Sequence, residues 1–225
     1  MTIHIDGSLG EGGGQVLRTS LALSALTGQP TQISNIRARR RNPGLAPQHL
    51  AGVRALAALC GAEVKGASIG SSRVDFAPGG PVQAGEYIFD VSALAGQGSA
   101  GAVTLLLQTL LWPLLYAQGE SHLTLRGGTH VAWSPPADYL RDVLLPTLAP
   151  LGVDVSCELT GWGFYPVGGG ELQVKIRPVA GTLRPLLLEE RGGLARVSGL
   201  AVAAELPAHI AQRISNRAQN VLRQA

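Results

Sequence analysis

The sequence contains one series of elements twice, and this internal duplication constrains the fold more than any other feature of the chain. Leu50 matches Leu140, 90 residues later, and Gly61 matches Gly152, 91 residues later. In each copy a strand is expected to lead into a helix, followed by a strand, a second helix and two more strands. A glycine that ends a helix is common, so the repeated order of the whole series is what indicates a duplication.

The first copy spans residues 1–80 and the second spans residues 81–180. In the first, hydrophobic period and glycine punctuation predict strands at Ile3–Asp6, Thr31–Ile36, Glu63–Ala67 and Arg73–Ala77, and helices at Gln15–Leu26 and Pro47–Cys60. In the second they predict strands at Tyr87–Val91, His122–Arg126, Val153–Glu158 and Glu171–Ile176, helices at Ala102–Ala117 and Pro136–Leu151, and a loop at Ser92–Gly101.

A third copy begins within residues 181–225, with a strand expected at Leu194–Glu205 and a helix at Pro207–Arg223, and it is incomplete. The order β-α-β-α-β-β is typical of split βαβ units, in which two helices cover one face of a four-stranded sheet. We therefore predict an α+β fold made of two complete repeats and the start of a third.

Composition favours a globular protein of the cytoplasm. Hydrophobic residues make up 45% of the 225 residues, enough for a sizeable core. The N-terminus does not read as a signal peptide, and the most apolar stretch, Val103–Ala117, is too short to span a membrane. Cys60 and Cys157 have no metal-site or disulfide spacing, so we expect free core thiols. Arginine greatly outnumbers lysine, which suits nucleotide or nucleic-acid binding but also fits the codon preference of a GC-rich genome.

The stretch "DGSLGEGGGQVLR", Asp6 to Arg18, is the first candidate site. It lacks the Gly-Lys-Ser/Thr of a Walker A motif and the third glycine of a dinucleotide fingerprint. Glycines let backbone N–H groups converge, and the following helix directs its positive end to the same place, which favours an anion. Glu11 would repel a phosphate unless Mg²⁺ or Mn²⁺ lay between them, so we interpret Glu11 as a metal ligand. The alternative is a tight turn whose acid complements the helix dipole.

The stretch "IRARRRNPGLAPQH" places Arg37, Arg39, Arg40 and Arg41 in a loop between a strand and a helix. One or two of these arginines could converge with Arg18 on a polyphosphate or an RNA end, and Gln48 could join them. The alternative is a solvated charged loop. His49, beside Gln48, is the only histidine near this candidate site; none of the five histidines stands in a recognisable catalytic or metal-binding spacing.

Two further stretches carry polar or aromatic groups. Gln108 lies inside the most apolar helix, where a buried amide without a partner costs about 1–3 kcal/mol, so it should bond to a backbone carbonyl or to a bound nucleotide. The stretch "FYPVGGGEL", Phe164 to Leu172, reads as a lead-in to a strand, with aromatic residues free to contact a base.

These stretches, with "LLLQT" and "GGTHVAWSPPADYL", stand in the order found in the RNA 3′-terminal phosphate cyclases, and the chain resembles that family over nearly all of its length. The resemblance implies a large domain of three split βαβ repeats, similar to the C-terminal domain of translation initiation factor three, with a small domain inserted in the third. The predicted third repeat stops about where that insertion would start.

The resemblance also implies an ATP-dependent enzyme of the ligase class that converts an RNA 3′-phosphate to a 2′,3′-cyclic phosphate through enzyme-AMP and RNA-adenylate intermediates. By matched position, Glu11 resembles the metal-binding acid, and Arg18, Arg37, Arg40 and Gln48 resemble residues around the phosphates. Gln108 resembles the glutamine that contacts ATP, and Pro135 would lie near the adenine. The expected ligands are ATP, Mg²⁺ or Mn²⁺, and RNA with a 3′-terminal phosphate.

One departure from the family affects catalysis. The family's nucleophilic histidine follows the inserted domain, so it is expected beyond residue 225, and we assign no catalytic residue to this chain. The expectation is therefore a C-terminally truncated cyclase, which lacks the nucleophile as it stands. The alternative is a non-catalytic, cyclase-like RNA-binding or ribosome-assembly protein. An incomplete third sheet would expose apolar surface, so we also expect a homo-oligomer.

Overall fold

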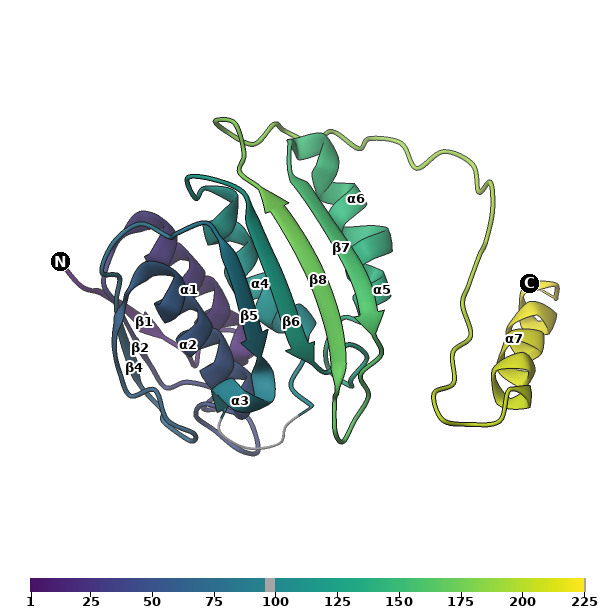
Figure 1. Cartoon of the computed structure of the whole chain (residues 1–225), viewed down its shortest axis with the longest axis horizontal. Coiled ribbons are helices and arrows are strands. Elements are labelled where there is room, and N and C mark those ends of the chain that lie inside the picture. The colour runs from purple at the N-terminus through teal and green to yellow at the C-terminus, as the bar shows by residue number, and fades with distance from the viewer. Residues whose placement is uncertain (96–99, 225) are drawn as a thin grey trace. The chain divides into compact units, whose positions relative to one another are not determined.

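The computed structural model describes residues 1–95 and 100–224, so residues 96–99 of the loop predicted at Ser92–Gly101 lie outside the described residues. The chain divides into two compact units, Met1–Pro185 and Leu186–Ala225. The first unit contains both predicted complete repeats (Figure 1).

The first repeat forms a four-stranded sheet in the order β1-β2-β4-β3. Its strands are β1 (Ile3–Asp6), β2 (Thr31–Ser34), β3 (Glu63–Lys65) and β4 (Val74–Ala77). β1 and β2 are parallel, and β4 runs antiparallel to both β2 and β3. Ile33 and Phe76 point from this sheet into the core and are almost fully buried. Alternation along each strand explains this arrangement, because every second side chain faces the helices.

Two helices connect these strands. α1 (Gly14–Thr27) follows β1, and α2 (Pro47–Cys60) follows β2. Both end at a glycine in the left-handed conformation, Gly28 with φ = 69° and Gly61 with φ = 59°. Glycine adopts this conformation without steric cost, so it is the residue expected to end a helix there. The predicted limits of α2 are confirmed at both ends.

The second repeat has the same topology, with strands in the order β5-β6-β8-β7. Its strands are β5 (Glu86–Asp90), β6 (Ser121–Gly127), β7 (Asp154–Gly161) and β8 (Gly170–Arg177). β5 and β6 are parallel, whereas β8 is antiparallel to β6 and β7, as in the first sheet. Identical order and direction in both sheets confirm the split βαβ repeat and the α+β fold class.

The helices of the second repeat differ in detail from the prediction. α3 (Val91–Ala95) occupies part of the stretch predicted as a loop. The helix predicted at Pro136–Leu151 is divided into α5 (Ala137–Tyr139), the π-helical turn η1 (Leu140–Leu144), α6 (Leu145–Leu148) and the 3₁₀ turn η2 (Ala149–Leu151). Pro146 accounts for the irregularity, because proline has no N–H to donate and its ring crowds the preceding turn.

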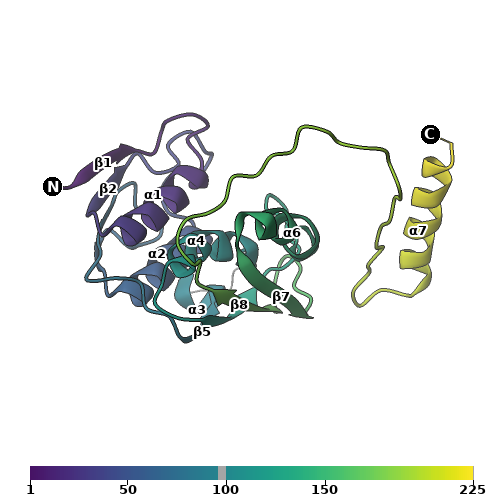
Figure 2. The ribbon, with the colours of Figure 1, turned by 90° about the horizontal axis from the view of Figure 1, so that it is seen from above.

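The core of the first unit centres on α4 (Val103–Leu115). Leu107, Leu110 and Leu114 of this helix are at most 1% exposed. α4 packs on α1 and α2 from the first repeat and on β6 and β8 from the second, as Figure 2 shows from above. The two repeats therefore share one hydrophobic core.

The second unit holds one helix, α7 (His209–Leu222). The strand predicted at Leu194–Glu205 is wrong, because those residues have no regular secondary structure. A strand needs a neighbour to satisfy its backbone N–H and C=O groups, and no strand of the described chain pairs with this segment. The helix predicted at Pro207–Arg223 is confirmed, with each end shortened.

No helix among residues 1–95 and 100–224 is both long and apolar enough to cross a membrane. Cys60 is a buried free thiol, as expected, whereas Cys157 is a free thiol that is only half-buried. Burial raises the pKa of both, that of Cys157 to about 11.

Candidate functional site

Two loops of the first repeat meet at the start of α1. They are the glycine loop, residues 7–13, which links β1 to α1, and the arginine loop, residues 35–46, which links β2 to α2. Arg39 donates from Nη1 to the carbonyl oxygen of Gly10 at 2.9 Å, and Arg40 donates from Nη2 to Oε2 of Glu11 at 3.0 Å. A Cβ atom at Gly13 would lie 2.7 Å from Nη2 of Arg40, so a larger residue there would displace the end of the Arg40 side chain.

The two loops are also joined at their strand ends. Oδ1 of Asp6 accepts hydrogen bonds from the Ser8 amide at 2.9 Å and from Nδ2 of Asn35 at 3.1 Å. These bonds, first of all those from Ser8, lower the pKa of Asp6. Arg37 has φ = 53°, an uncommon value for a residue with a side chain, and donates from Nη1 to the Gly44 carbonyl at 2.8 Å. Strand ends and local bonds thus fix the course of the arginine loop.

Among the described residues, the first N–H groups of α1 have no hydrogen-bond partner, and they lie beside these cations. Gly13 occupies the cap position and provides no side-chain bond to the helix. The first N–H groups of a helix have no partner within the helix, and the helix dipole gives that end a partial positive charge. Together with the guanidinium of Arg40, this geometry favours an anion such as a phosphate group.

Arg18 connects this region to the second repeat. Its Nε donates to Oε1 of Gln108 on α4 at 3.1 Å, and its Nη2 donates to Oε1 of Gln15 at 3.0 Å. Burial lowers the pKa of Arg18. The side-chain oxygen of Gln108 therefore bonds to a guanidinium, which differs from both partners considered for it from the sequence. Arg18 and Gln108, with Thr19 and Trp112, line a hollow of about 230 Å³ between α1 and α4.

His49 lies directly behind the glycine loop, and its side chain is almost fully buried. Nδ1 accepts a hydrogen bond from the Ala46 amide at 3.3 Å, and Nε2 faces Gly14 so closely that a Cβ there would lie 2.1 Å from it. Burial, followed by the positive charges of Arg37 and Arg18, lowers the pKa of His49 to about 3. The imidazole is therefore neutral near pH 7, and it packs against the start of α1 with one ring nitrogen already bonded.

Glu11 forms the one ion pair of the arginine loop within the described chain, and its side chain is 89% exposed. No group of three or more possible metal ligands of the His, Cys, Asp and Glu types exists within residues 1–95 and 100–224. A single exposed carboxylate fits Mg²⁺ or Mn²⁺ only where phosphate oxygens and water complete the shell, which is a common arrangement for Mg²⁺. Glu11 therefore fits a metal that arrives with a phosphate ligand.

Gln48 and Pro135, two other residues predicted for the site, lie in different surroundings. Gln48 is half-buried at the start of α2, and it lines a hollow together with Trp133 and Tyr165 of the second repeat. Pro135 belongs to the same loop as Trp133, the one between β6 and α5. Among the described residues, the hydrogen bonds and ion pairs of the arginine cluster do not include Gln48 or Pro135.

Comparison with known proteins identifies the family. The model of the RNA 3′-terminal phosphate cyclase family matches residues 9–215. The chain belongs to this family. Proteins named RNA 3′-terminal phosphate cyclase are similar to it over 99% of its length, with 57% identity for the one from Nostoc sp., 53% for that from Methylococcus capsulatus and 46% for that from Staphylothermus marinus. The chain spans 64%, 62% and 60% of those relatives, respectively.

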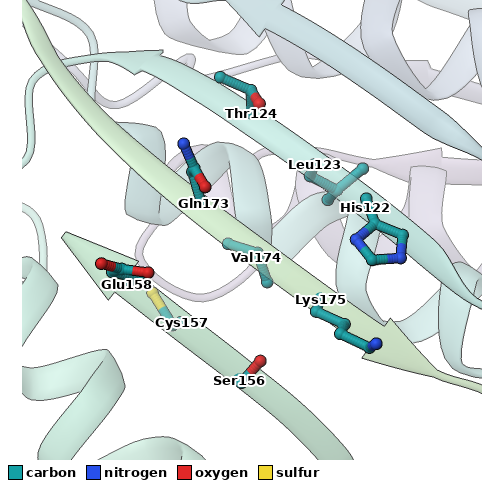
Figure 3. A pocket seen from close by; sticks show the side chains of 9 residues that line it. All are labelled: His122, Leu123, Thr124, Ser156, Cys157, Glu158, Gln173, Val174 and Lys175. Atoms are coloured by element: carbon teal, nitrogen blue, oxygen red, sulfur yellow. The ribbon is translucent and has the colours of Figure 1, made fainter. Parts of the chain in front are cut away.

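This cyclase-family chain has another hollow, of about 280 Å³, on the outer face of the second sheet (Figure 3). His122 and Lys175 line it, and both bond to Oε1 of Glu120 at 2.8 Å. Bonds from Lys175 first, then from His122 and Arg177, lower the pKa of Glu120 to about 2. Glu120 thus engages both of these side chains, and none of the site residues predicted from the sequence lines this hollow.

Sequence reasoning missed three features of the region. The first is the bond from Arg39 to Gly10, for which the sequence contains no recognisable motif. The second is the enclosure of His49, which depends on two loops that are far apart in the sequence and meet only in the folded chain. The third is the exposure of Trp133 beside Gln48. Its stretch "WSPP" reads as an ordinary helix start, and the one available signal was the unusual run of tryptophan and prolines.

Proposed function

We propose that this chain supplies the phosphate-binding and ATP-binding part of an enzyme that converts an RNA 3′-terminal phosphate to a 2′,3′-cyclic phosphate. The supporting observation is that the guanidinium groups of Arg40 and Arg18 both approach the glycine turn at the start of α1, where Arg40 is paired with Glu11. This arrangement offers cations, free backbone donors and one carboxylate, which together match a polyphosphate with a divalent metal.

The proposed reaction is a series of phosphoryl transfers that depend on ATP. A histidine nitrogen attacks the α-phosphorus of ATP and releases pyrophosphate, the AMP passes to the RNA 3′-phosphate, and the vicinal 2′-hydroxyl then displaces AMP to close the cyclic diester. Each step accumulates negative charge on non-bridging oxygens, so preorganised cations lower the barrier. A metal ion bound at Glu11 would neutralise phosphate charge.

This chain's own residues have distinct parts in that proposal. Arg40 and the α1 N–H groups bind phosphate oxygens, while Arg18 is held toward the cluster by Gln108. Because Gln108 accepts from Nε of Arg18, it restricts the guanidinium to one orientation. His49 fills the space behind the glycine loop and excludes water from it. Its imidazole stays neutral, so it adds no positive charge that would repel the guanidinium of Arg18.

None of the five histidines is assigned as the nucleophile. His49 packs against Gly14, and both ring nitrogens of His130 are hydrogen-bonded, to Thr129 and Asp138. His4 and His122 stand on the sheets, each bonded to a polar neighbour, Gln32 and Glu120 respectively, and His209 is the first residue of α7 in the second unit. We therefore expect this 225-residue chain to bind ATP without forming a covalent AMP adduct.

ATP binding tests the proposal directly. Isothermal titration with ATP and Mg²⁺ should show that Arg18→Ala, Gln108→Ala and Glu11→Ala each weaken binding by about tenfold or more, since a hydrogen bond to a charged group contributes roughly 1.5–3 kcal/mol. Arg126→Ala and Gln173→Ala are matched controls on the outer face of the second sheet, and both should bind as the parent chain does.

Two results would contradict the proposal. Labelling of the chain by ATP radioactive in the α-phosphate would show that the nucleophile lies within it. RNA binding without any ATP binding, indifferent to Glu11→Ala and Gln108→Ala, would instead support the alternative, a non-catalytic cyclase-like protein that keeps the fold for RNA binding or ribosome assembly.

A further inference from the structure

A hollow of about 590 Å³ lies where the two repeats meet at the start of α2. Gln48 forms its first-repeat side, and Ala100, Gly101, Val131, Ala132, Trp133, Tyr165 and Pro166 form its second-repeat side. Gln48 directly precedes His49, whose ring contacts the turn at Gly14. Gln48 therefore links the hollow, through its neighbour His49, to the phosphate-binding cluster, and the volume of the hollow leaves room for a group larger than a phosphate.

The two aromatic side chains of this hollow are exposed to an unusual degree. Trp133 is 100% exposed and Tyr165 is 81% exposed. Large aromatic side chains normally gain free energy by burial, so exposed ones beside a hollow indicate a binding surface. Both come from loops, the one between β6 and α5 and the one between β7 and β8.

The backbone holds Trp133 in a strained conformation. Its φ is 65°, in the left-handed region that bulky side chains rarely adopt. Such strain persists where the surrounding structure enforces it, and it is common at ligand sites. The adjacent Ser134 donates from Oγ to the Val131 carbonyl at 2.9 Å and closes this turn. The loop thus presents the indole outward at a cost in local stability.

A network behind the hollow joins the two aromatic loops. Nε2 of His130 bonds to Oδ2 of Asp138 at 2.8 Å, and its ring stacks on Trp162 with centroids 4.6 Å apart. Oγ1 of Thr129 accepts from the Gly163 amide at 2.8 Å. The contacts to Trp162 and Gly163 join the loop that carries Trp133 to the loop that carries Tyr165, and the bond to Asp138 ties the first loop to α5. The network therefore restrains both aromatic loops.

We propose that this hollow binds a nucleobase at the 3′ end of single-stranded RNA by stacking on Trp133 and Tyr165. The inference rests on the proposed function, because the phosphate that follows the base would enter the adjoining arginine cluster. Stacking on aromatic faces accepts any of the four bases, which suits an enzyme that acts on RNA ends. The amide of Gln48 stands at the border, where it can bond to the sugar or the phosphate.

The test compares the affinity of the full chain for two RNA probes by fluorescence anisotropy. One is a short single-stranded oligoribonucleotide with a 3′-phosphate, and the other has the same length and phosphate but an abasic terminal nucleotide. Trp133→Ala and Tyr165→Ala should each weaken binding of the first probe by about 5- to 150-fold. Trp133→Phe should retain most of the affinity, because it keeps an aromatic face.

The abasic probe makes the test specific. The parent chain should bind the abasic probe less tightly than the complete probe. Trp133→Ala should cause little further loss of affinity for the abasic probe, because the missing base has already removed the stacking contact that the indole would make. Tyr116→Ala removes a 42%-exposed tyrosine that follows the opposite end of α4, so it is the matched control and should leave both affinities unchanged.

The outcomes separate this inference from the proposed function. RNA affinity that is unaffected by Trp133→Ala and Tyr165→Ala, in a chain that still binds ATP through Arg18, overturns the stacking site alone. Loss of ATP affinity in these two variants with RNA affinity intact also overturns it, since the hollow would then hold the adenine of ATP. Absence of both ATP and RNA binding in the parent chain refutes the proposed function itself.

Discussion

The imidazole of His49 is enclosed between Gly14 and the arginine loop, where Arg37 and Arg18 add positive charge. Its pKa is lowered to about 3, whereas an unfolded histidine titrates near pH 6.5. Between pH 3 and pH 6.5, the histidine is protonated in the unfolded chain and neutral in the folded chain. Stability is therefore complete above about pH 6.5 and decreases as the pH falls toward 3.

This linkage predicts a measurable loss of stability in mild acid. Between pH 7 and pH 5, His49 should account for a decrease in the free energy of unfolding on the order of 2 kcal/mol. Urea denaturation at the two pH values measures it, with His49→Gln as the comparison, because glutamine does not titrate. An equal decrease in the parent and in His49→Gln would show that other groups cause the acid sensitivity.

Single residues also show what the sequence can and cannot predict. The stretch from Asp6 to Arg18 identifies an anion-binding turn, because glycines before a helix start have a direct physical meaning. The bond between Arg18 and Gln108 joins residues 90 positions apart, and the packing of α1 on α4 alone creates it. Similarly, the strained φ of Trp133 is imposed by the loop around it. The backbone preferences of tryptophan would not predict that value.

At the scale of elements, α1 approaches α2 so closely that Gly14 contacts His49. A Cβ at Gly14 would lie 2.1 Å from Nε2 of His49 and 3.0 Å from Nη1 of Arg18. We therefore predict that Gly14→Ala destabilises the protein by about 1–3 kcal/mol, although alanine is normally the better residue in a helix. For a chain of this size, thermal unfolding should move down by roughly 2–12 °C.

Gly80→Ala is the matched control for this change. No atom lies within 4 Å of a Cβ built at Gly80, and its φ is outside the left-handed region, so its unfolding temperature should stay close to that of the parent. If Gly14→Ala were as stable as Gly80→Ala, the close packing of His49 on the start of α1 would be contradicted.

Elements differ in how well the sequence predicts them, and the reason is physical. α2 has local signals at both ends, a proline at its start and Gly61 after its end, so its limits follow from the sequence. The division of the helix at residues 137–151 depends on how the backbone around Pro146 adjusts. The spacing of apolar residues predicts a helix there but does not predict where it becomes irregular. The wrong strand at Leu194–Glu205 shows the same limit, because strands depend on partners.

At the scale of the whole molecule, two repeats with the same strand order share one core in the first unit. The second unit differs because many of its apolar side chains are exposed. α7 has an apolar stripe formed by Ile210, Ile214 and Val221, and none of its residues is buried. Leu187, Leu188 and Leu194, from the segment before it, are each more than 70% exposed. Exposed apolar groups in this number favour association.

We therefore predict that the chain self-associates through its second unit. Light scattering and sedimentation velocity should show a mass that increases with protein concentration, because burial of apolar surface between copies yields roughly 25 cal/mol per Å². Ile214→Lys combined with Leu222→Lys should reduce the association, since a buried unpaired charge is costly. Asn220→Lys adds a charge to the same helix without removing apolar surface, so it should associate like the parent.

A parent chain that remains monomeric at high concentration would contradict the prediction. Association that persists in the double variant would place the contact on the first unit instead, where the exposed Trp133 and Tyr165 are the strongest apolar candidates.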